Sequence, residues 1–283
     1  ALPGGFPLGY LRRALSRDSH SVTERLVGDS YQAAVRVPGG PARLRLELAP
    51  DCIQAEISSG TGLDAHTLAV GLIGLDQNAG AFSRLAHELG FARLVREREE
   101  LRLAQTPSVY DAILWSIIGQ QINFPFACLL KRRLVERTGT PVADGLFAPP
   151  TPAAVAALAP ADLLPLQFSR QKADYVINVS RLIAEGQLDL EALRKVSATR
   201  AERTLLALRG LGPWSVNYIL MRALGDPDCV PLGDTGVTRG LQALLKLEER
   251  PDVDATRRLM TMFAPYRSLA TTHLWQFQQP PPT

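Results

Sequence analysis

Polar and apolar residues alternate strictly in a short stretch near the N-terminus. Charged residues alternate with leucines over 43–48, and the same two-residue period recurs over 53–57, with Pro50-Asp51 between the runs. A period of two is typical of half-buried β-strands, so the pattern predicts an antiparallel pair joined by a turn. Helical periodicity follows over 63–75. Residues 1–88 are therefore predicted to form a small α+β lobe with an antiparallel sheet.

From about residue 89 onward the hydrophobic period is that of helices. Three predicted helix starts carry a side chain that caps helices: Ser108, Thr151 and Ser169. Charges alternate densely over 93–102, which predicts a solvated helix face. The polar, proline-rich tail 278–283 has nothing to bury and is expected to be disordered.

The stretch 208–215, Leu-Arg-Gly-Leu-Gly-Pro-Trp-Ser, separates two predicted helices. Upstream, Thr199 to Glu202 have capping-box spacing, and downstream Pro213 suits the first turn of a helix. Gly210 and Gly212 allow a tight turn that exposes backbone N–H groups at a helix N-terminus, a geometry that binds phosphate. On these residues alone, a plain interhelical turn and a phosphate site are equally open.

A second feature follows this hairpin. The residues Gly-Asp-Pro-Asp over 225–228 break the chain, and Gly233-Asp234-Thr235 then opens another helix. On spacing alone, Asp234 is an ordinary N-cap aspartate, whose negative charge a helix N-terminus stabilises. Asp226 and Asp228 lie in the preceding loop and are expected to tolerate replacement by asparagine.

Composition and charge narrow the classes of function. A chain of 283 residues can hold two or three lobes, and a formal charge of +3 permits nucleic-acid binding without requiring it. The three cysteines are far apart and odd in number, and the four histidines lack metal-ligand spacing. These features exclude a disulfide framework and a four-cysteine iron–sulfur or zinc site. No apolar run is long enough to span a bilayer. We therefore expect no metal, no cofactor and no membrane contact.

The hairpin followed by an aspartate at a helix start resembles the helix-hairpin-helix DNA glycosylases. Within that superfamily the chain is most similar to the bacterial 3-methyladenine DNA glycosylase II (AlkA) type, from about Gly9 to Trp275. The resemblance implies a mainly α, two-lobed helix-hairpin-helix glycosylase fold preceded by the small α+β lobe. Within residues 89–283, the inner helical lobe would cover about 109–226, and the second would combine 89–108 with 227–283.

The resemblance also implies an activity, namely hydrolysis of the N-glycosidic bond of alkylated purines such as 3-methyladenine and 7-methylguanine after base flipping. Asp234 would be the catalytic residue, because a carboxylate stabilises the oxocarbenium character of the transition state. The family's base pocket falls on aromatic residues of this chain: Trp214, Tyr218, Trp275 and, at the rim, Tyr10. Their π faces are expected to favour a cationic purine.

The residues leave two features of the pocket open. Tyr10 and Tyr218 would suit a protein core equally well. Gln276 stands directly after Trp275, where some relatives carry another aromatic residue, so the pocket would be more polar or more open.

DNA contacts are implied at two further places. The hairpin would hold phosphate through five residues that offer a backbone N–H, a hydroxyl or a charge: Arg209, Gly210, Gly212, Trp214 and Ser215. A turn over 119–123 matches the family's wedge, which fills the gap in the duplex. The wedge is often apolar, but here the matching position is Gln121, with Ile122 beside it. A polar end to the preceding helix is the alternative.

The remaining expectations concern the type of enzyme. Superfamily members that also cleave the strand use a lysine where this chain has Trp214, so the resemblance implies a monofunctional DNA-3-methyladenine glycosylase II. Its partner would be double-stranded DNA containing damaged bases, and it would act as a cytoplasmic monomer at the bacterial nucleoid. A monovalent cation on the hairpin carbonyls is compatible with the resemblance. The alternative is a non-catalytic DNA-binding module, which needs neither the carboxylate nor the aromatic cluster.

Overall fold

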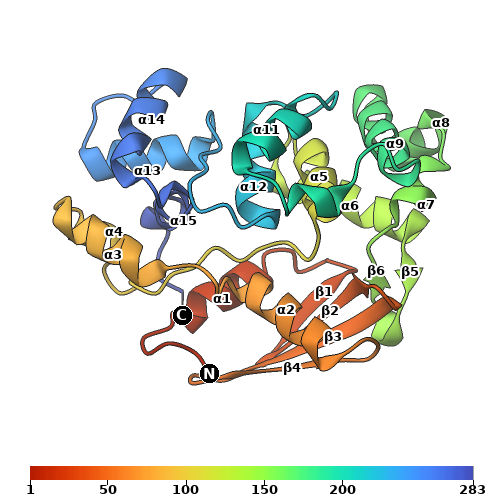
Figure 1. Ribbon diagram of the computed structural model, residues 1–283, viewed down its shortest axis with the longest axis horizontal. Coiled ribbons are helices and arrows are strands. Elements are labelled where there is room, and N and C mark those ends of the chain that lie inside the picture. Colours follow the sequence, from red (N-terminus) through yellow and green to blue (C-terminus); the bar gives the residue numbers. More distant parts are fainter. Residues whose placement is uncertain (283) are drawn as a thin grey trace.

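A computed structural model describes residues 1–282. The N-terminal part is a four-stranded antiparallel sheet with two helices, and the rest is mainly helical (Figure 1). The N-terminal elements are α1 (Leu8–Leu15), β1 (Glu24–Val27), β2 (Ser30–Val37), β3 (Gly40–Leu48), β4 (Ile53–Ile57) and α2 (Gly62–Ile73). The strands pair in the order β1-β2-β3-β4. The sheet lies along one side of the helical part (Figure 1).

The two predicted strands are confirmed as β3 and β4, with Leu44 opposite Ile57 and Leu48 opposite Ile53. β1 and β2 were not predicted. β2 contains two adjacent alanines, Ala33 and Ala34, that are both buried. Ala33 packs in the core beneath the sheet and Ala34 packs on the short strand β6 (Phe147–Ala148). Burial on both faces removes the alternation by which half-buried strands are found.

The remaining elements run from α3 to α15. The first are α3 (Ala79–Glu88), α4 (Ala92–Val95), α5 (Val109–Ile118), α6 (Phe124–Thr138), β5 (Thr140–Pro141), η1 (Ala143–Gly145), β6, α7 (Pro152–Ala156), α8 (Pro160–Leu163) and η2 (Leu164–Leu166). They are followed by α9 (Arg170–Ala184), α10 (Leu190–Leu193), α11 (Ala198–Leu206), α12 (Pro213–Ala223), α13 (Thr235–Leu245), α14 (Val253–Met260), η3 (Thr261–Phe263) and α15 (Arg267–Phe277). None of the helices within 1–282 has the length and apolar character needed to cross a membrane.

The predicted helix starts are confirmed at Ser108, Thr151 and Ser169, whose side chains each accept a hydrogen bond from a backbone N–H of the first turn. The capping box predicted over 199–202 is wrong. α11 begins at Ala198, and Ser197 is the N-cap that accepts from the backbone N–H of Arg200. The correct cap lies two residues upstream of the predicted one.

The charged stretch 93–102 is not the solvated helix face that its sequence predicted. α4 ends at Val95, and Arg98 is only 7% exposed. Its guanidinium donates to the Leu94 carbonyl, the Tyr10 hydroxyl and the Gln276 carbonyl. Arg98 therefore turns inward and connects α1 to the end of α15, which charge alternation along the sequence cannot reveal.

The tail also differs from its prediction over 278–282. The guanidinium of Arg13 on α1 donates to the Pro280 carbonyl at 2.7 Å. A Cβ at Gly9 of α1 would lie 3.1 Å from the ring of Pro282, and Figure 1 shows the C-terminus beside α1. Tail and α1 thus pack against each other, while Thr283 lies outside the described residues.

Besides the small cluster around Ala34 and β6, three large clusters of buried apolar side chains organise the described chain. One joins the sheet to α1 and α2, one is built mainly from α5 to α12, and one combines α3 and α4 with α13 to α15. Phe82 and Ala86 of α3 are fully buried in the third cluster. We therefore propose that the N-terminal lobe ends before α3 rather than at residue 88. The other predicted lobe boundaries stay predictions.

Candidate active site

The hairpin between α11 and α12 is held in shape by Gly210. Its φ of +99° is in the left-handed region, and a Cβ there would lie 2.5 Å from the ring of Tyr175. Only glycine satisfies both constraints. The Gly210 carbonyl accepts a hydrogen bond at 2.7 Å from Nε2 of Gln120, just beyond the end of α5. Gly212 is surrounded by open space, so a side chain there would point away from the protein.

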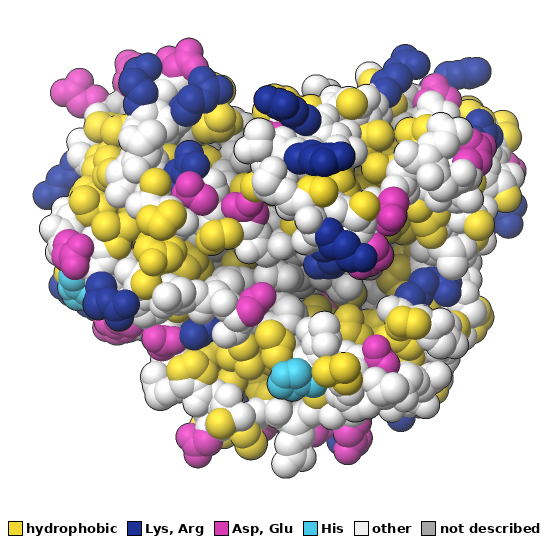
Figure 2. Space-filling model, viewed as in Figure 1, with side chains coloured by type: hydrophobic (Ala, Val, Ile, Leu, Met, Phe, Trp, Pro, Cys, Tyr) yellow, Lys and Arg dark blue, Asp and Glu magenta, His cyan; other side chains and the backbone are white. Residues whose placement is uncertain are grey.

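The hairpin presents a basic surface with free donors. Gly212 is the N-cap of α12 and Pro213 follows in the first turn. Both are exposed, and the backbone N–H groups of Gly212 and Trp214 have no acceptor within the described part of the chain. Arg209 is exposed beside them. Lys and Arg side chains gather around α11 on this face, above a hollow (Figure 2). Such a surface suits an anion.

Ser215 does not share this surface. Only 2% of the residue is exposed, and its Oγ accepts from Nε2 of Gln120 at 3.3 Å. The predicted hydroxyl contact with DNA is therefore replaced by a structural one, which helps to fix the hairpin on α5.

Asp234 is the N-cap of α13, and its carboxylate accepts three hydrogen bonds. Oδ1 accepts from the backbone N–H of Val237 at 3.0 Å and from the indole N–H of Trp275 at 2.9 Å. Oδ2 accepts from the indole N–H of Trp214 at 3.2 Å. Donors from α12, α13 and α15 therefore fix the carboxylate, and Oδ2 keeps the capacity to accept from a further donor.

A glycine on α13 makes this arrangement sterically feasible. A Cβ at Gly236 would lie 2.6 Å from Cδ1 of Trp275 and 3.0 Å from Oδ1 of Asp234. Any other residue would push the indole away from the carboxylate. The sequence signal for this, a glycine two positions after the aspartate, was missed.

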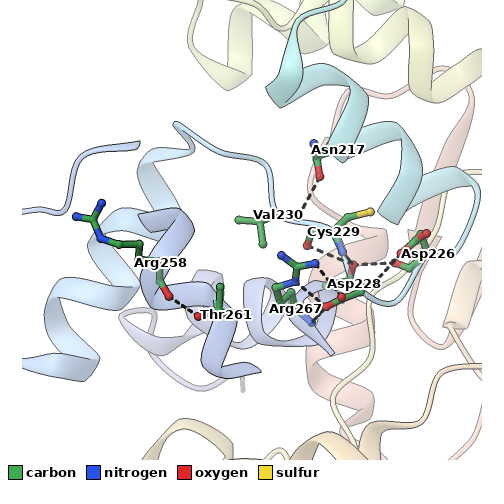
Figure 3. Close-up of polar contacts among 9 residues, drawn as sticks. Asn217, Asp226, Asp228, Cys229, Val230, Arg258, Thr261 and Arg267 are labelled. Carbon is green, nitrogen blue, oxygen red and sulfur yellow. Dashed lines mark hydrogen bonds and ion pairs between the residues drawn. The ribbon is translucent and has the colours of Figure 1, made fainter. Parts of the chain in front are cut away.

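The loop between α12 and α13 is tied to both neighbouring helices (Figure 3). Arg267, at the start of α15, donates to both carboxylate oxygens of Asp228 at 2.7 and 2.8 Å. Oδ1 of Asn217 on α12 accepts from the Val230 N–H. Asp226 accepts from the Asp228 N–H at 2.8 Å. Asp226 and Asp228 thus hold the loop that leads to Asp234, and Asp228 does so through an ion pair with Arg267. Their tolerance to replacement by asparagine stays a prediction.

A cavity of about 670 Å³ opens beside Asp234. All four predicted aromatic residues line it: Tyr10, Trp214, Tyr218 and Trp275. The rings of Trp214 and Tyr218 are stacked, with centroids 5.3 Å apart and an interplanar angle of 17°. Tyr218 is only 9% exposed, so it is buried and lines the cavity as well. Gln276 also lines the cavity, so the position after Trp275 contributes a polar side chain.

The two wedge candidates lie differently. Gln121 is exposed with a φ of +56°, a left-handed conformation that glutamine seldom adopts. Ile122 is half-buried and lines the cavity. The turn therefore projects Gln121 outward and Ile122 inward.

Sequence reasoning missed several residues of the cavity. Two are aromatic, Trp115 and Phe124, and four are arginines, Arg13, Arg17, Arg102 and Arg222. Arg222 follows Trp214 and Tyr218 at intervals of four residues, which places it near the same face of α12. That spacing was a usable signal. The arginines from the N-terminal part and from 101–104 reach the cavity only through tertiary packing.

The chain is similar to known DNA repair proteins. Residues 114–265 match the family described as HhH-GPD superfamily base excision DNA repair protein. A Bacillus subtilis protein named DNA-3-methyladenine glycosylase is 34% identical over 179 residues, which cover 62% of this chain and 59% of that protein. A Mycobacterium tuberculosis protein named "probable bifunctional transcriptional activator/DNA repair enzyme AlkA" is 28% identical over 262 residues, 89% of this chain and 51% of its own length. The chain thus spans between about half and three fifths of these relatives.

A solved structure has the same fold over nearly the whole chain. The 3-methyladenine DNA-glycosylase from Archaeoglobus fulgidus superposes with a TM-score of 0.83 over 95% of this chain and 94% of that chain, at 20% identity. The predicted mainly α fold with an N-terminal antiparallel sheet is thereby confirmed.

Proposed function

We propose a function from one premise: the chain belongs to the HhH-GPD superfamily of base excision DNA repair proteins. It is a DNA glycosylase that hydrolyses the N-glycosidic bond of alkylated purines, 3-methyladenine and 7-methylguanine among them, after flipping the base out of the duplex. The observation that carries this proposal is the Asp234 carboxylate, held by two indole N–H groups beside an aromatic cavity. A non-catalytic DNA-binding module has no use for that arrangement.

The carboxylate would act by its charge. Breaking the bond between the base and C1′ gives the sugar oxocarbenium character, which a fixed anion close to C1′ stabilises. Oδ2 of Asp234 has capacity for one more donor and would orient the attacking water. The flipped base would lie in the cavity against the stacked Trp214 and Tyr218 rings, with Tyr10 and Trp275 on its other sides.

Double-stranded DNA containing a damaged base would be the partner. The free N–H groups of the hairpin and the exposed Arg209 support phosphate binding, which does not depend on sequence. Gln121 projects from the turn after α5 and would enter the gap left by the flipped base. The enzyme would work as a cytoplasmic monomer without a cofactor.

The enzyme would be monofunctional. A glycosylase that also nicks the strand needs an amine at C1′ to form a Schiff base. The lysines of the chain are Lys131, Lys172, Lys195 and Lys246. None of them lines the cavity beside Asp234. The ammonium group of Lys172 donates a hydrogen bond to the Ile118 carbonyl at 2.7 Å. A covalent protein–DNA adduct trapped by borohydride would contradict this part of the proposal.

The direct test is base release from methylated DNA. DNA treated with a radiolabelled methylating agent is incubated with the protein, and the released bases are separated by chromatography. The proposal predicts free 3-methyladenine and 7-methylguanine above the spontaneous background. Tight binding to the same DNA without any released base would favour a binding module instead.

A further inference from the structure

One side chain ties the turn that carries the wedge candidates to the hairpin. Nε2 of Gln120, the residue directly before Gln121, donates to the Gly210 carbonyl at 2.7 Å and to Oγ of Ser215 at 3.3 Å. Ser215 is buried in the first turn of α12, so both acceptors belong to the hairpin and its second helix. An amide nitrogen has two hydrogens to donate, and here both are used on the element that is proposed to bind phosphate.

A second tie runs through α9. Lys172, in the first turn of this helix, donates a hydrogen bond at 2.7 Å to the carbonyl of Ile118, the last residue of α5. The carbonyl end of a helix has partial negative charge, which attracts an ammonium group. Tyr175, three residues further along α9, lies against Gly210 of the hairpin. α5 also packs against both α9 and α12 (Figure 1). The end of α5, the start of α9 and the hairpin therefore hold one another in place.

The far end of the turn is supported as well. Asn123 is the N-cap of α6, and its side chain accepts from the backbone N–H of Phe126 at 3.0 Å. The ring of Phe124 packs edge-on against Trp115 of α5, with centroids 5.7 Å apart and an interplanar angle of 69°. The turn 119–123 is thus fixed on both sides of the exposed Gln121.

These supports account for the unusual backbone of the turn. Gln121 has a φ of +56°, and a residue other than glycine keeps a left-handed conformation only where its surroundings impose it. The contacts made by Gln120, Lys172 and Asn123 impose it here. A side chain on a backbone held in this way can press into a stack of bases without being pushed back.

We propose that Gln120 and Lys172 are positioning residues that lock the wedge turn to the phosphate-binding hairpin. Binding to the DNA backbone and entry into the base stack then occur as one movement. Taking a paired base out of the stack costs free energy, and contacts elsewhere on the DNA offset that cost when they are rigidly connected to the entering group. Neither residue lines the cavity beside Asp234, so neither acts on the base directly. The inference rests on the proposed glycosylase function.

Two duplexes separate this role from a general contribution to stability. Each contains one 7-methylguanine, which is paired with cytosine in one duplex and lies in an unpaired bubble in the other. Gln120→Met keeps the length of the side chain and removes both donors. In single-turnover measurements it should slow excision from the paired duplex by roughly fivefold, about the effect of one lost hydrogen bond, and leave excision from the bubble unchanged. Gln187→Met, at an exposed glutamine beyond the end of α9, is the matched control.

The second tie is tested in the same way. Lys172→Met should also slow excision from the paired duplex alone, and Lys172→Arg, which keeps a donor, should lie closer to the wild type. Circular dichroism shows which variants fold, and Lys172→Met decides the question if Gln120→Met does not fold.

A double variant tests the coupling itself. Once the side chain of Gln121 is gone, the loss of its support should have little further effect. Gln120→Met combined with Gln121→Gly should therefore excise from the paired duplex about as fast as Gln121→Gly alone. Slowing by the full product of the two single effects would contradict the coupling.

The outcomes distinguish this inference from the proposed function. Equal slowing on the paired and bubble duplexes in the folded variants, or no slowing on either, would overturn the positioning role and leave the proposed function standing. A wild-type protein that releases 7-methylguanine from neither duplex would instead contradict the proposed function.

Discussion

The indole N–H of Trp275 donates to Oδ1 of Asp234 at 2.9 Å, across the contact between α15 and α13. The indole N–H of Trp214 on α12 approaches Oδ2 in the same way, at 3.2 Å. Each ring therefore fixes the carboxylate through its N–H edge, and both residues line the cavity. The residues that would hold the base thus also orient the charge that would act on the sugar.

Trp275→Phe tests this double role, because it keeps an aromatic face and removes the donor. A hydrogen bond to a charged group contributes about 1.5–3 kcal/mol, so excision of 3-methyladenine should slow by at least about tenfold in single-turnover measurements. Binding to abasic-site DNA should survive. Trp115→Phe also removes an indole N–H from the cavity wall but none that reaches Asp234, and it should slow excision less. Equal effects of the two changes would argue against orientation by Trp275.

The hairpin glycines allow a test of DNA anchoring. Gly212 has open space around it, so Gly212→Leu should leave the fold intact while the new side chain keeps phosphate away. We expect duplex affinity to fall. The slope of log K against log salt should become shallower by roughly 0.9, which corresponds to the loss of one phosphate contact. Fluorescence anisotropy at several salt concentrations measures both quantities. Unchanged affinity would mean that DNA is not anchored here. Gly210→Ala is unsuitable, because its Cβ would clash with Tyr175.

His273 should make the protein sensitive to acid. It is fully buried, and desolvation, followed by the charge of Arg98, lowers its pKa to about 3. At a pH below the ordinary pKa of histidine, His273 binds a proton in the unfolded chain but stays neutral in the native state. Stability should therefore fall as pH drops from about 6.5 toward about 3, with a loss of roughly 2–3 kcal/mol by pH 4.5. Urea unfolding at pH 7.5 and 4.5 measures it. The His273→Gln variant should have a smaller free energy of unfolding at pH 7.5 than the wild type, yet lose less of it between pH 7.5 and pH 4.5. An equal loss in both proteins would assign the acid sensitivity to other groups.

Gln121 should matter only when the lesion is paired. Gln121→Gly removes the side chain and suits the left-handed backbone at that position. Flipping a paired base costs a few kcal/mol more than flipping an unpaired one. Excision from a fully paired duplex should therefore slow, while excision from a duplex with the lesion in an unpaired bubble should not. Equal slowing on both substrates would remove Gln121 as the wedge, and Ile122→Ala would then be the next variant to compare.

Much of this architecture follows local rules and could be predicted from the sequence. Ser108, Ser169 and Pro213 mark helix starts by chemistry confined to one turn, and Asp234 was found because it caps a helix directly after a glycine. The resemblance then added the aromatic residues, which the structure brings together around one cavity.

What could not be predicted depends on contacts between distant segments. Arg98 was interpreted as a surface charge, yet it reaches Tyr10 and the Gln276 carbonyl far along the chain. The buried Ser215 hydroxyl accepts from Gln120, which lies in the turn after α5, about 95 residues earlier in the chain. Arg17 follows α1 and lines the cavity beside the Phe124 ring, far along the chain, so no periodicity in the sequence marks it.

The central claim is that the charge of Asp234 carries catalysis, and single-turnover excision by Asp234→Asn tests it most directly. Asparagine keeps an oxygen for the Val237 and Trp275 donors but has no charge. Asp254→Asn, at an exposed position in the first turn of α14, replaces Asp226 and Asp228 as the control, because those two residues hold the loop. The account predicts that Asp234→Asn lowers the rate of 3-methyladenine excision by at least roughly 10²–10⁴-fold while abasic-site binding persists. Excision by Asp234→Asn at the rate of the Asp254→Asn control would contradict it.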